Sequence, residues 1–126
     1  MKVVVETSAA PKAIGPYSQG IKAGGFLFVS GQIPIDPETG SMAAVDVVAQ
    51  TKQVMANLGA ILSAEGLGFK DLVKTTIFLT DLSDFARVND AYAEYFESDP
   101  PARSTIQVVA LPKGAKIEIE AIATLG

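Results

Sequence analysis

A change of hydrophobic period near the middle of the chain limits the possible folds most strongly. From Asp46 onward, apolar residues recur at helical spacing as far as Leu62. Asp46 is a fair N-cap and Gly66 stands where a C-terminal glycine is expected. Between Lys70 and Thr80 the pattern instead alternates, as it does in a strand with two unequal faces. A long amphipathic helix followed by a strand predicts a protein that mixes α and β structure.

The remaining elements follow from similar patterns. Residues 3–6 read as a short strand, and the apolar run 24–31, bracketed by glycines, predicts a fully buried strand. Residues 34–40 read as a loop, and a second helix begins after a cap at Ser83 or Asp84 and ends by Pro100. Two last strands are expected at about 104–110 and 116–124, joined by a connection of hairpin length. The order is strands at the start, then helix, strand, helix and two strands, which predicts an α+β fold with both helices on one face of the sheet.

Length and hydropathy fit one domain over residues 1–126. A chain of this length can bury one core and little more. Its apolar fraction of 48% is high and is compatible with burial at a subunit interface. No apolar run approaches the roughly 20 residues that span a bilayer, and no secretory signal is evident. A cytoplasmic protein is therefore expected.

Composition excludes several kinds of chemistry. The chain has no cysteine, so it can form no disulfide and has no thiol nucleophile. It also has no histidine, which makes a zinc site improbable, and we expect neither a metal nor another cofactor. A net charge of −4 opposes binding to phosphate backbones, so nucleic acid is a poor candidate partner.

Polar residues alternate along both of the last two strands. Arg103 shares a strand face with Thr105, while Glu118 and Glu120 share a face of the following strand. Close pairing of these strands could place guanidinium and carboxylates around one small cavity, where arginine suits a carboxylate ligand and glutamate suits proton transfer. The alternative is an ordinary solvated sheet face with a cross-strand ion pair. Spacing alone leaves both interpretations open.

Arg87 is the other arginine of the chain, and it has a simpler explanation. It lies three residues from both Asp84 and Asp90 on the second predicted helix, so we expect a solvated ion pair there. Arg103 has no such local partner, so it is the candidate functional arginine.

Seven motifs, in register over nearly the whole chain, resemble those of the RidA/YjgF family, the endoribonuclease L-PSP-like reactive-intermediate deaminases. They are Ala13–Gly20 (AIGPYSQG), Val29–Pro34 (VSGQIP), Val73–Thr76 (VKTT), Asp84–Phe85 (DF), Val88–Asn89 (VN), Pro101–Ser104 (PARS) and Ile117–Ala123 (IEIEAIA). The resemblance implies a chorismate-mutase-like α+β domain that assembles as a homotrimer with three ligand clefts between subunits.

The resemblance also implies an activity. Family members hydrolyse 2-imino acids, such as 2-iminobutanoate, 2-iminopropanoate and the related enamine 2-aminoacrylate, to 2-keto acids and ammonia without a cofactor. Arg103 matches the family's carboxylate-binding arginine. Glu118 matches the acid that holds or activates the attacking water, whereas Glu120 matches no residue given that role.

Four further positions match the family's cleft. Tyr17 would orient the substrate or share a proton, Gly31 would let the backbone approach the ligand, and Asn89 and Thr105 would help to bind it. Each also has a plainer interpretation: Tyr17 as a packing aromatic, Gly31 as a turn glycine and Asn89 as an exposed polar residue. Many relatives carry cysteine in place of Thr105, so a thiol cannot be essential here if the activity is retained.

Other functions fit the same residues. A non-catalytic trimer that binds a small carboxylate metabolite would need Arg103 but not Glu118, and another small-acid enzyme could use the same fold. Ribonuclease and chaperone-like activities have also been attributed to the family. The acidic charge opposes the first, and no feature of the sequence supports the second.

Overall fold

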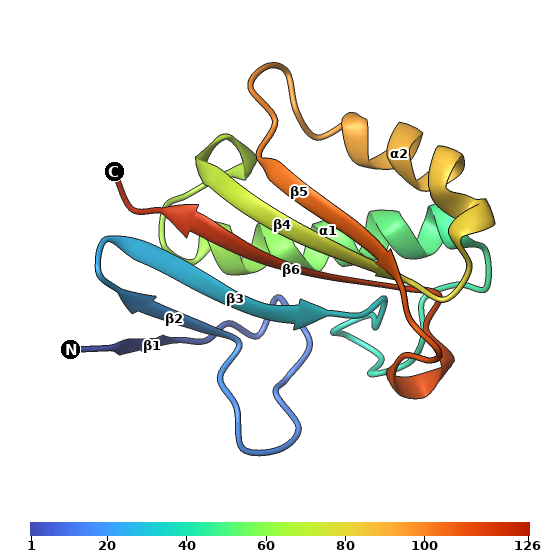
Figure 1. Cartoon of the computed structure of the whole chain (residues 1–126). Helices are drawn as coiled ribbons and strands as arrows, with labels where there is room; N and C mark the ends of the chain where they lie inside the picture. The colour runs from blue at the N-terminus through green and yellow to red at the C-terminus, as the bar shows by residue number, and fades with distance from the viewer.

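A single mixed sheet carries two α-helices on one of its faces (Figure 1). The computed structural model describes all residues, 1–126, and the strands are ordered β1-β2-β3-β6-β4-β5. In chain order the strands are β1 (Val3–Val5), β2 (Gly20–Ala23), β3 (Phe26–Gln32), β4 (Leu72–Leu79), β5 (Ala102–Gln107) and β6 (Ile117–Thr124). The helices are α1 (Val47–Ser63) and α2 (Phe85–Ala93), so the expected α+β class and helix placement are confirmed.

The long helix α1 begins and ends where the sequence predicts. The Asp46 side chain accepts hydrogen bonds from the backbone N–H groups of Val48 and Ala49, both at 3.1 Å. Gly66 has a φ of 71°, which a residue with a Cβ adopts only at a cost, and it lets the chain turn away after the last helical turn.

The core lies between α1 and the sheet. Side chains of α1 meet the inward-facing residues of β3, β4 and β6, and the largest of these are fully buried: Leu27, Met55, Leu58, Ile61, Leu62, Ile77, Leu79, Ile117 and Ile119. Asn57 is buried among them and donates to the carbonyls of Ile33 and Ile35, at 3.1 and 2.9 Å. It thereby ties the loop that follows β3 to the helix.

The second helix is shorter than predicted and is capped differently. It ends at Ala93, well before Pro100, and the chain then forms a loop that projects beyond the sheet (Figure 1). Asp84 precedes the helix but makes no capping hydrogen bond, because its carboxylate pairs with Arg87. Asp81 instead caps the preceding 3₁₀ turn by accepting from the Ser83 N–H at 2.9 Å. The ion pair expected for Arg87 is confirmed.

The last two strands do not form the expected hairpin. β6 lies between β3 and β4 and is antiparallel to both, whereas β5 lies at the sheet edge, parallel to β4. Helix α2 is the crossover between β4 and β5, and such a crossover brings its two strands together in parallel. β6 can then occupy the sheet centre, where Ile117, Ile119 and Ala123 are fully buried.

The face of the sheet opposite the helices is uncovered, and it is largely apolar where β1, β2 and β3 form it. β3 alternates, with Leu27 and Val29 in the core but Phe26 and Phe28 41% and 43% exposed, so the prediction of a fully buried strand was wrong. The strand registers place Val4, Ile21 and Ile122 on the same face as Phe28.

A bulge also corrects the expected faces of β4. It lies between Leu72 and Lys74. Strict alternation would put Val73 on the buried side with Thr75, whereas the bulge turns Leu72 into the core and leaves Val73 39% exposed. No helix is long and apolar enough to cross a membrane.

Candidate active site

Arg103 lies on the edge strand β5 and faces helix α2. It pairs in register with Thr75 of β4, whose hydroxyl contacts Tyr92 of α2, so the Arg103 side chain is on the helix side of the sheet. Its guanidinium carbon lies 5.3 Å from the ring centroid of Tyr92 and 5.6 Å from that of Phe85. Both distances are within the range of cation–π attraction.

No acidic side chain neutralises Arg103. The ion pairs of the chain are Lys22–Glu65, Lys70–Asp71 and Arg87–Asp84, and Arg103 donates none of the side-chain hydrogen bonds. Its position depends on aromatic faces rather than on a carboxylate. The N–H donors of the guanidinium therefore stay free for an anionic ligand, and a carboxylate can use two of them at once.

A hollow of about 620 Å³ opens beside Arg103. Asn89 and Tyr92 of α2 line it together with Phe96 and Pro101 of the projecting loop. Thr105 follows two residues after Arg103 on the same strand face, and its hydroxyl oxygen is buried without a hydrogen-bond partner. The structure thus brings Arg103, Asn89 and Thr105 to one side of the sheet.

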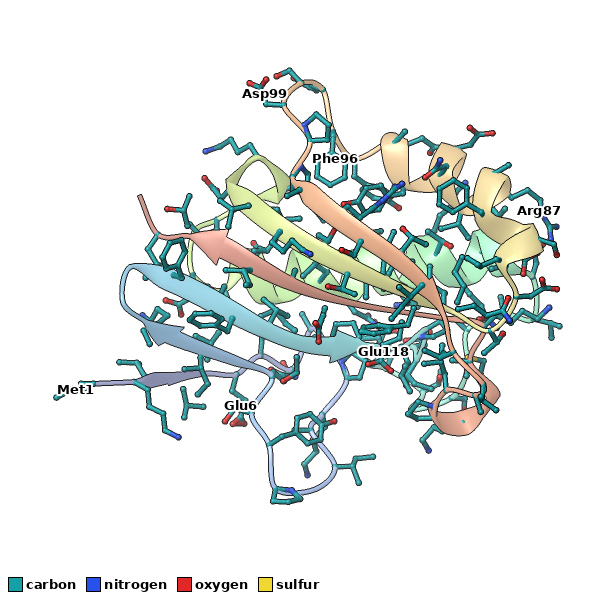
Figure 2. All side chains as sticks on the ribbon, viewed as in Figure 1. Met1, Glu6, Arg87, Phe96, Asp99 and Glu118 are labelled. Atoms are coloured by element: carbon teal, nitrogen blue, oxygen red, sulfur yellow. The ribbon has the colours of Figure 1, made fainter.

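Glu118 lies on the opposite side. It pairs in register with Phe78 of β4, three residues from Thr75, and residues three apart on a strand point to opposite faces. Figure 2 shows Glu118 beside the end of β3. There its carboxylate packs over Gly31, and a Cβ on Gly31 would lie 2.8 Å from the carboxyl carbon of Glu118. Only glycine leaves room for the carboxylate in this position.

The surroundings of Glu118 raise the pKa of its carboxyl group. Partial burial is the main cause, because it disfavours the charged form, and the like charge of Glu120 on the same strand face adds to it. A carboxyl group whose pKa is raised toward neutrality can both accept and return a proton.

Tyr17 stands on the loop that runs alongside Gly31. The Ser30 hydroxyl donates to the Ser18 carbonyl at 2.6 Å, and the Ser30 N–H donates to the Gln19 carbonyl at 2.9 Å, which fixes this loop against β3. Tyr17 itself is 53% exposed, and its hydroxyl accepts a long hydrogen bond from the Ile14 N–H at 3.4 Å. The Tyr17 side chain lines a different hollow, together with Val4, Glu6 and Lys12, so only Gly31 and Glu118 are in contact within this group of predicted residues.

The predicted site is divided between the two faces of the sheet. One half-site holds Arg103, Asn89 and Thr105, and the other holds Gly31 and Glu118 beside the loop that carries Tyr17. The expected cavity between adjacent last strands is therefore wrong for a single chain. The alternative of a cross-strand ion pair is also wrong, because β4 separates the two strands and Arg103 pairs with no acid.

Sequence reasoning missed the residues that hold Arg103. Helical spacing puts Phe85 and Tyr92 on the apolar face of the second helix, and alternation puts Thr75 on one side of its strand, but neither pattern indicates contact with Arg103. The available signal was Thr75 itself, a hydroxyl on an otherwise apolar strand face, since a buried hydroxyl needs a partner. No group of three acidic, histidine or cysteine side chains is placed to hold a metal ion.

Comparisons with known proteins agree with this architecture. The family model described as endoribonuclease L-PSP matches residues 7–125. The Reactive Intermediate Deaminase A, chloroplastic, of Arabidopsis thaliana is 56% identical over 124 residues, which are 98% of this chain and 66% of that protein. The human 2-iminobutanoate/2-iminopropanoate deaminase is 48% identical over 123 residues, which are 98% of this chain and 90% of that protein.

A solved structure with a ligand is similar as well. The crystal structure of E. coli TdcF with bound serine superposes with a TM-score of 0.93 at 46% identity, covering 97% of this chain and 98% of TdcF.

Proposed function

This chain belongs to the RidA/YjgF family, whose model is described as endoribonuclease L-PSP, and we propose that it hydrolyses small 2-imino acids to 2-keto acids and ammonia. The substrates would be 2-iminopropanoate, 2-iminobutanoate and related intermediates. The deaminase names of the Arabidopsis and human relatives support this activity.

The observation that carries the proposal is the unpaired guanidinium of Arg103 beside an open hollow. Two aromatic rings flank this guanidinium, and no acidic side chain forms an ion pair with it. A fork with free donors can bind both oxygens of a substrate carboxylate. Binding in this way fixes the position of the neighbouring imine carbon.

Glu118 would supply the proton transfers. As a carboxylate it accepts a proton from water while the water oxygen bonds to the carbon of the protonated imine, which gives a carbinolamine with a neutral amino group. The protonated Glu118 then returns its proton to that nitrogen, the carbon–nitrogen bond breaks to release ammonia, and the hydroxyl loses its proton to the ammonia as the keto carbonyl forms, so that the products are the keto acid and an ammonium ion. The raised pKa of Glu118 supports both steps, because it makes the carboxylate a stronger base toward water than an ordinary glutamate.

A complete site requires two copies of the chain. Arg103 and Glu118 lie on opposite faces of one sheet, so a cleft that contains both takes one half-site from each of two subunits. The uncovered apolar face, with Val4 at 56% and Phe26 at 41% exposure, supports such an assembly, since burying it would remove a large apolar patch from water. We therefore propose a homotrimer with three clefts between subunits.

The other predicted residues have roles in this cleft. Tyr17, whose loop is fixed beside Gly31, would orient the substrate or share a proton. Asn89 would bind substrate from α2, and Thr105 would offer its unpartnered hydroxyl. A cytoplasmic location stays a prediction from the sequence.

A coupled assay tests the function. A pyridoxal-phosphate lyase releases 2-aminoacrylate, and keto-acid formation is followed with the wild type, Arg103→Ala and Glu118→Gln at equal concentration. We expect both variants to lose the acceleration. Arg87→Ala is the matched control, because it removes the other arginine, which pairs with Asp84 on the surface, and it should keep full activity.

Other outcomes of this assay point elsewhere. If only Arg103→Ala loses the acceleration of keto-acid formation, Arg103 still binds the substrate carboxylate in the wild type, but Glu118 has no part in the mechanism. A folded wild type that accelerates none of several imino acids but binds a keto acid through Arg103 would favour a non-catalytic metabolite-binding protein. Sedimentation of the wild type tests the trimer, and a monomer with full activity would refute the shared cleft.

A further inference from the structure

The position of Arg103 is fixed by a two-residue support that the resemblance does not include. Tyr92 is 5% exposed, and its ring lies under the guanidinium, with the Arg103 guanidinium carbon 5.3 Å from the ring centroid. At the para position of the ring, the Tyr92 hydroxyl forms a buried hydrogen bond of 2.7 Å with the hydroxyl of Thr75. Thr75 is fully buried and is also the strand neighbour of Arg103.

We propose that Tyr92 is a positioning residue, which Thr75 locks in place so that its ring holds the Arg103 guanidinium at the mouth of the hollow. This inference rests on the proposed function, because it explains how the carboxylate-binding arginine is kept ready. Phe85 flanks the same guanidinium at 5.6 Å, but it is 38% exposed and has no anchor of this kind. Tyr92 therefore flanks the guanidinium from the buried side with an anchored ring, and Phe85 flanks it from the exposed side without such an anchor.

The geometry explains why an aromatic support suits this arginine better than an acid. A carboxylate partner would occupy the N–H donors and cancel the charge that the substrate must meet. A ring face attracts the flat side of the guanidinium and leaves its edges free. Burial raises the pKa of the Tyr92 phenol, so the ring stays neutral and does not pair with Arg103 as a phenolate.

The hydrogen bond to Thr75 gives this support its rigidity. Tyr92 packs against Phe96 on one side, with ring centroids 4.9 Å apart, and Phe96 belongs to the projecting loop. The Thr75 hydroxyl ties the far end of the Tyr92 ring to β4, the strand next to Arg103. Tyr92 is thus bonded to β4, and Arg103 belongs to the neighbouring strand β5, so two paired strands fix the positions of the ring and the arginine relative to each other.

Nuclear magnetic resonance of the arginine Nε–H groups tests the proposal without a substrate. The chain has two arginines, so a ¹⁵N spectrum shows two side-chain signals, and Arg103→Ala assigns them. In the wild-type protein we expect the Arg103 signal to be shifted upfield by the ring and to show a higher heteronuclear NOE than Arg87, which is exposed at the surface. Tyr92→Leu should abolish both differences.

Finer variants separate the ring from its anchor. Tyr92→Phe keeps the ring and removes the hydrogen bond, as Thr75→Val does from the other side, so each should lower the Arg103 NOE and leave part of the upfield shift. Their double variant should be no worse than either single variant, because both remove one interaction. Tyr95→Leu is the matched control, since Tyr95 packs on Phe69 and does not contact Arg103.

Binding of pyruvate, a 2-keto acid, gives the functional readout. We expect Tyr92→Leu to weaken pyruvate binding about tenfold and Tyr92→Phe about threefold, within the range of cation–π contributions. The variant Tyr95→Leu should bind pyruvate as the wild type does. A folded Tyr92→Leu protein that retains the wild-type Arg103 signal would overturn the proposal, and so would unchanged pyruvate affinity. If no imine is hydrolysed, the proposed function fails, while the Nε–H signals still decide this inference.

Discussion

Replacing Gly31 by alanine tests the placement of Glu118 most directly. The new Cβ would lie 2.8 Å from the Glu118 carboxyl carbon and 3.1 Å from its Cγ, whereas carbon atoms in contact normally stay about 3.5 to 4.0 Å apart. The carboxylate must therefore retreat by about 1 Å. A displacement of this size at a reacting group lowers the rate by about 100-fold, or about 2.7 kcal/mol of transition-state stabilisation.

The fold should tolerate this change. Gly31 does not have a positive φ, so alanine can adopt its backbone conformation, and the clash involves the end of a flexible side chain. We expect the melting temperature to stay within a few degrees of the wild-type value while kcat/KM for imine hydrolysis falls. Gly68→Ala is the matched control, since a Cβ there meets open space, and its activity should be unchanged.

A double variant shows whether the effect passes through Glu118. If Gly31→Ala acts by displacing the carboxylate, Gly31→Ala combined with Glu118→Gln should be no slower than Glu118→Gln alone. Full additivity would instead favour direct contact between the Gly31 backbone and the ligand, as the family resemblance implies. A Gly31→Ala protein with wild-type kcat/KM would refute the reasoning altogether.

Three further changes test other parts of the structure. The pKa of Glu118 is raised in the folded protein, so the wild type loses stability as pH rises from its unfolded pKa through its folded pKa. The melting temperature of Glu118→Gln relative to the wild type should therefore increase as the pH rises above about 4, and a constant difference would contradict the raised pKa. Asn57→Ala should cost about 2–4 kcal/mol in urea unfolding at fixed protein concentration, because the carbonyls of Ile33 and Ile35 lose their donors. Arg87→Ala should change the same free energy by less than about 1 kcal/mol, since its pair with Asp84 is solvated, and a larger loss would mean that the pair is structural.

The sequence by itself determined the local structure and the pairs of residues that share a strand face. The cap at Asp46, the glycine turn at Gly66 and the alternation of Glu118 and Glu120 with apolar residues were all readable, because each depends on neighbours along the chain. Motif spacing also indicated the family, and it named Arg103 and Glu118 as site residues without showing how they meet.

Only the tertiary structure decided the strand order, and with it the faces to which these two residues point. Alternation tells which residues share a face but not which face is covered or which strand is the neighbour, since backbone hydrogen bonds are the same for any partner. The short link before Lys116 favoured a hairpin, whereas the crossover through α2 placed β5 beside β4. Arg103 therefore faces Tyr92, and Glu118 faces the uncovered side. The separation of the predicted residues onto two faces of the sheet follows from packing that no local pattern encodes.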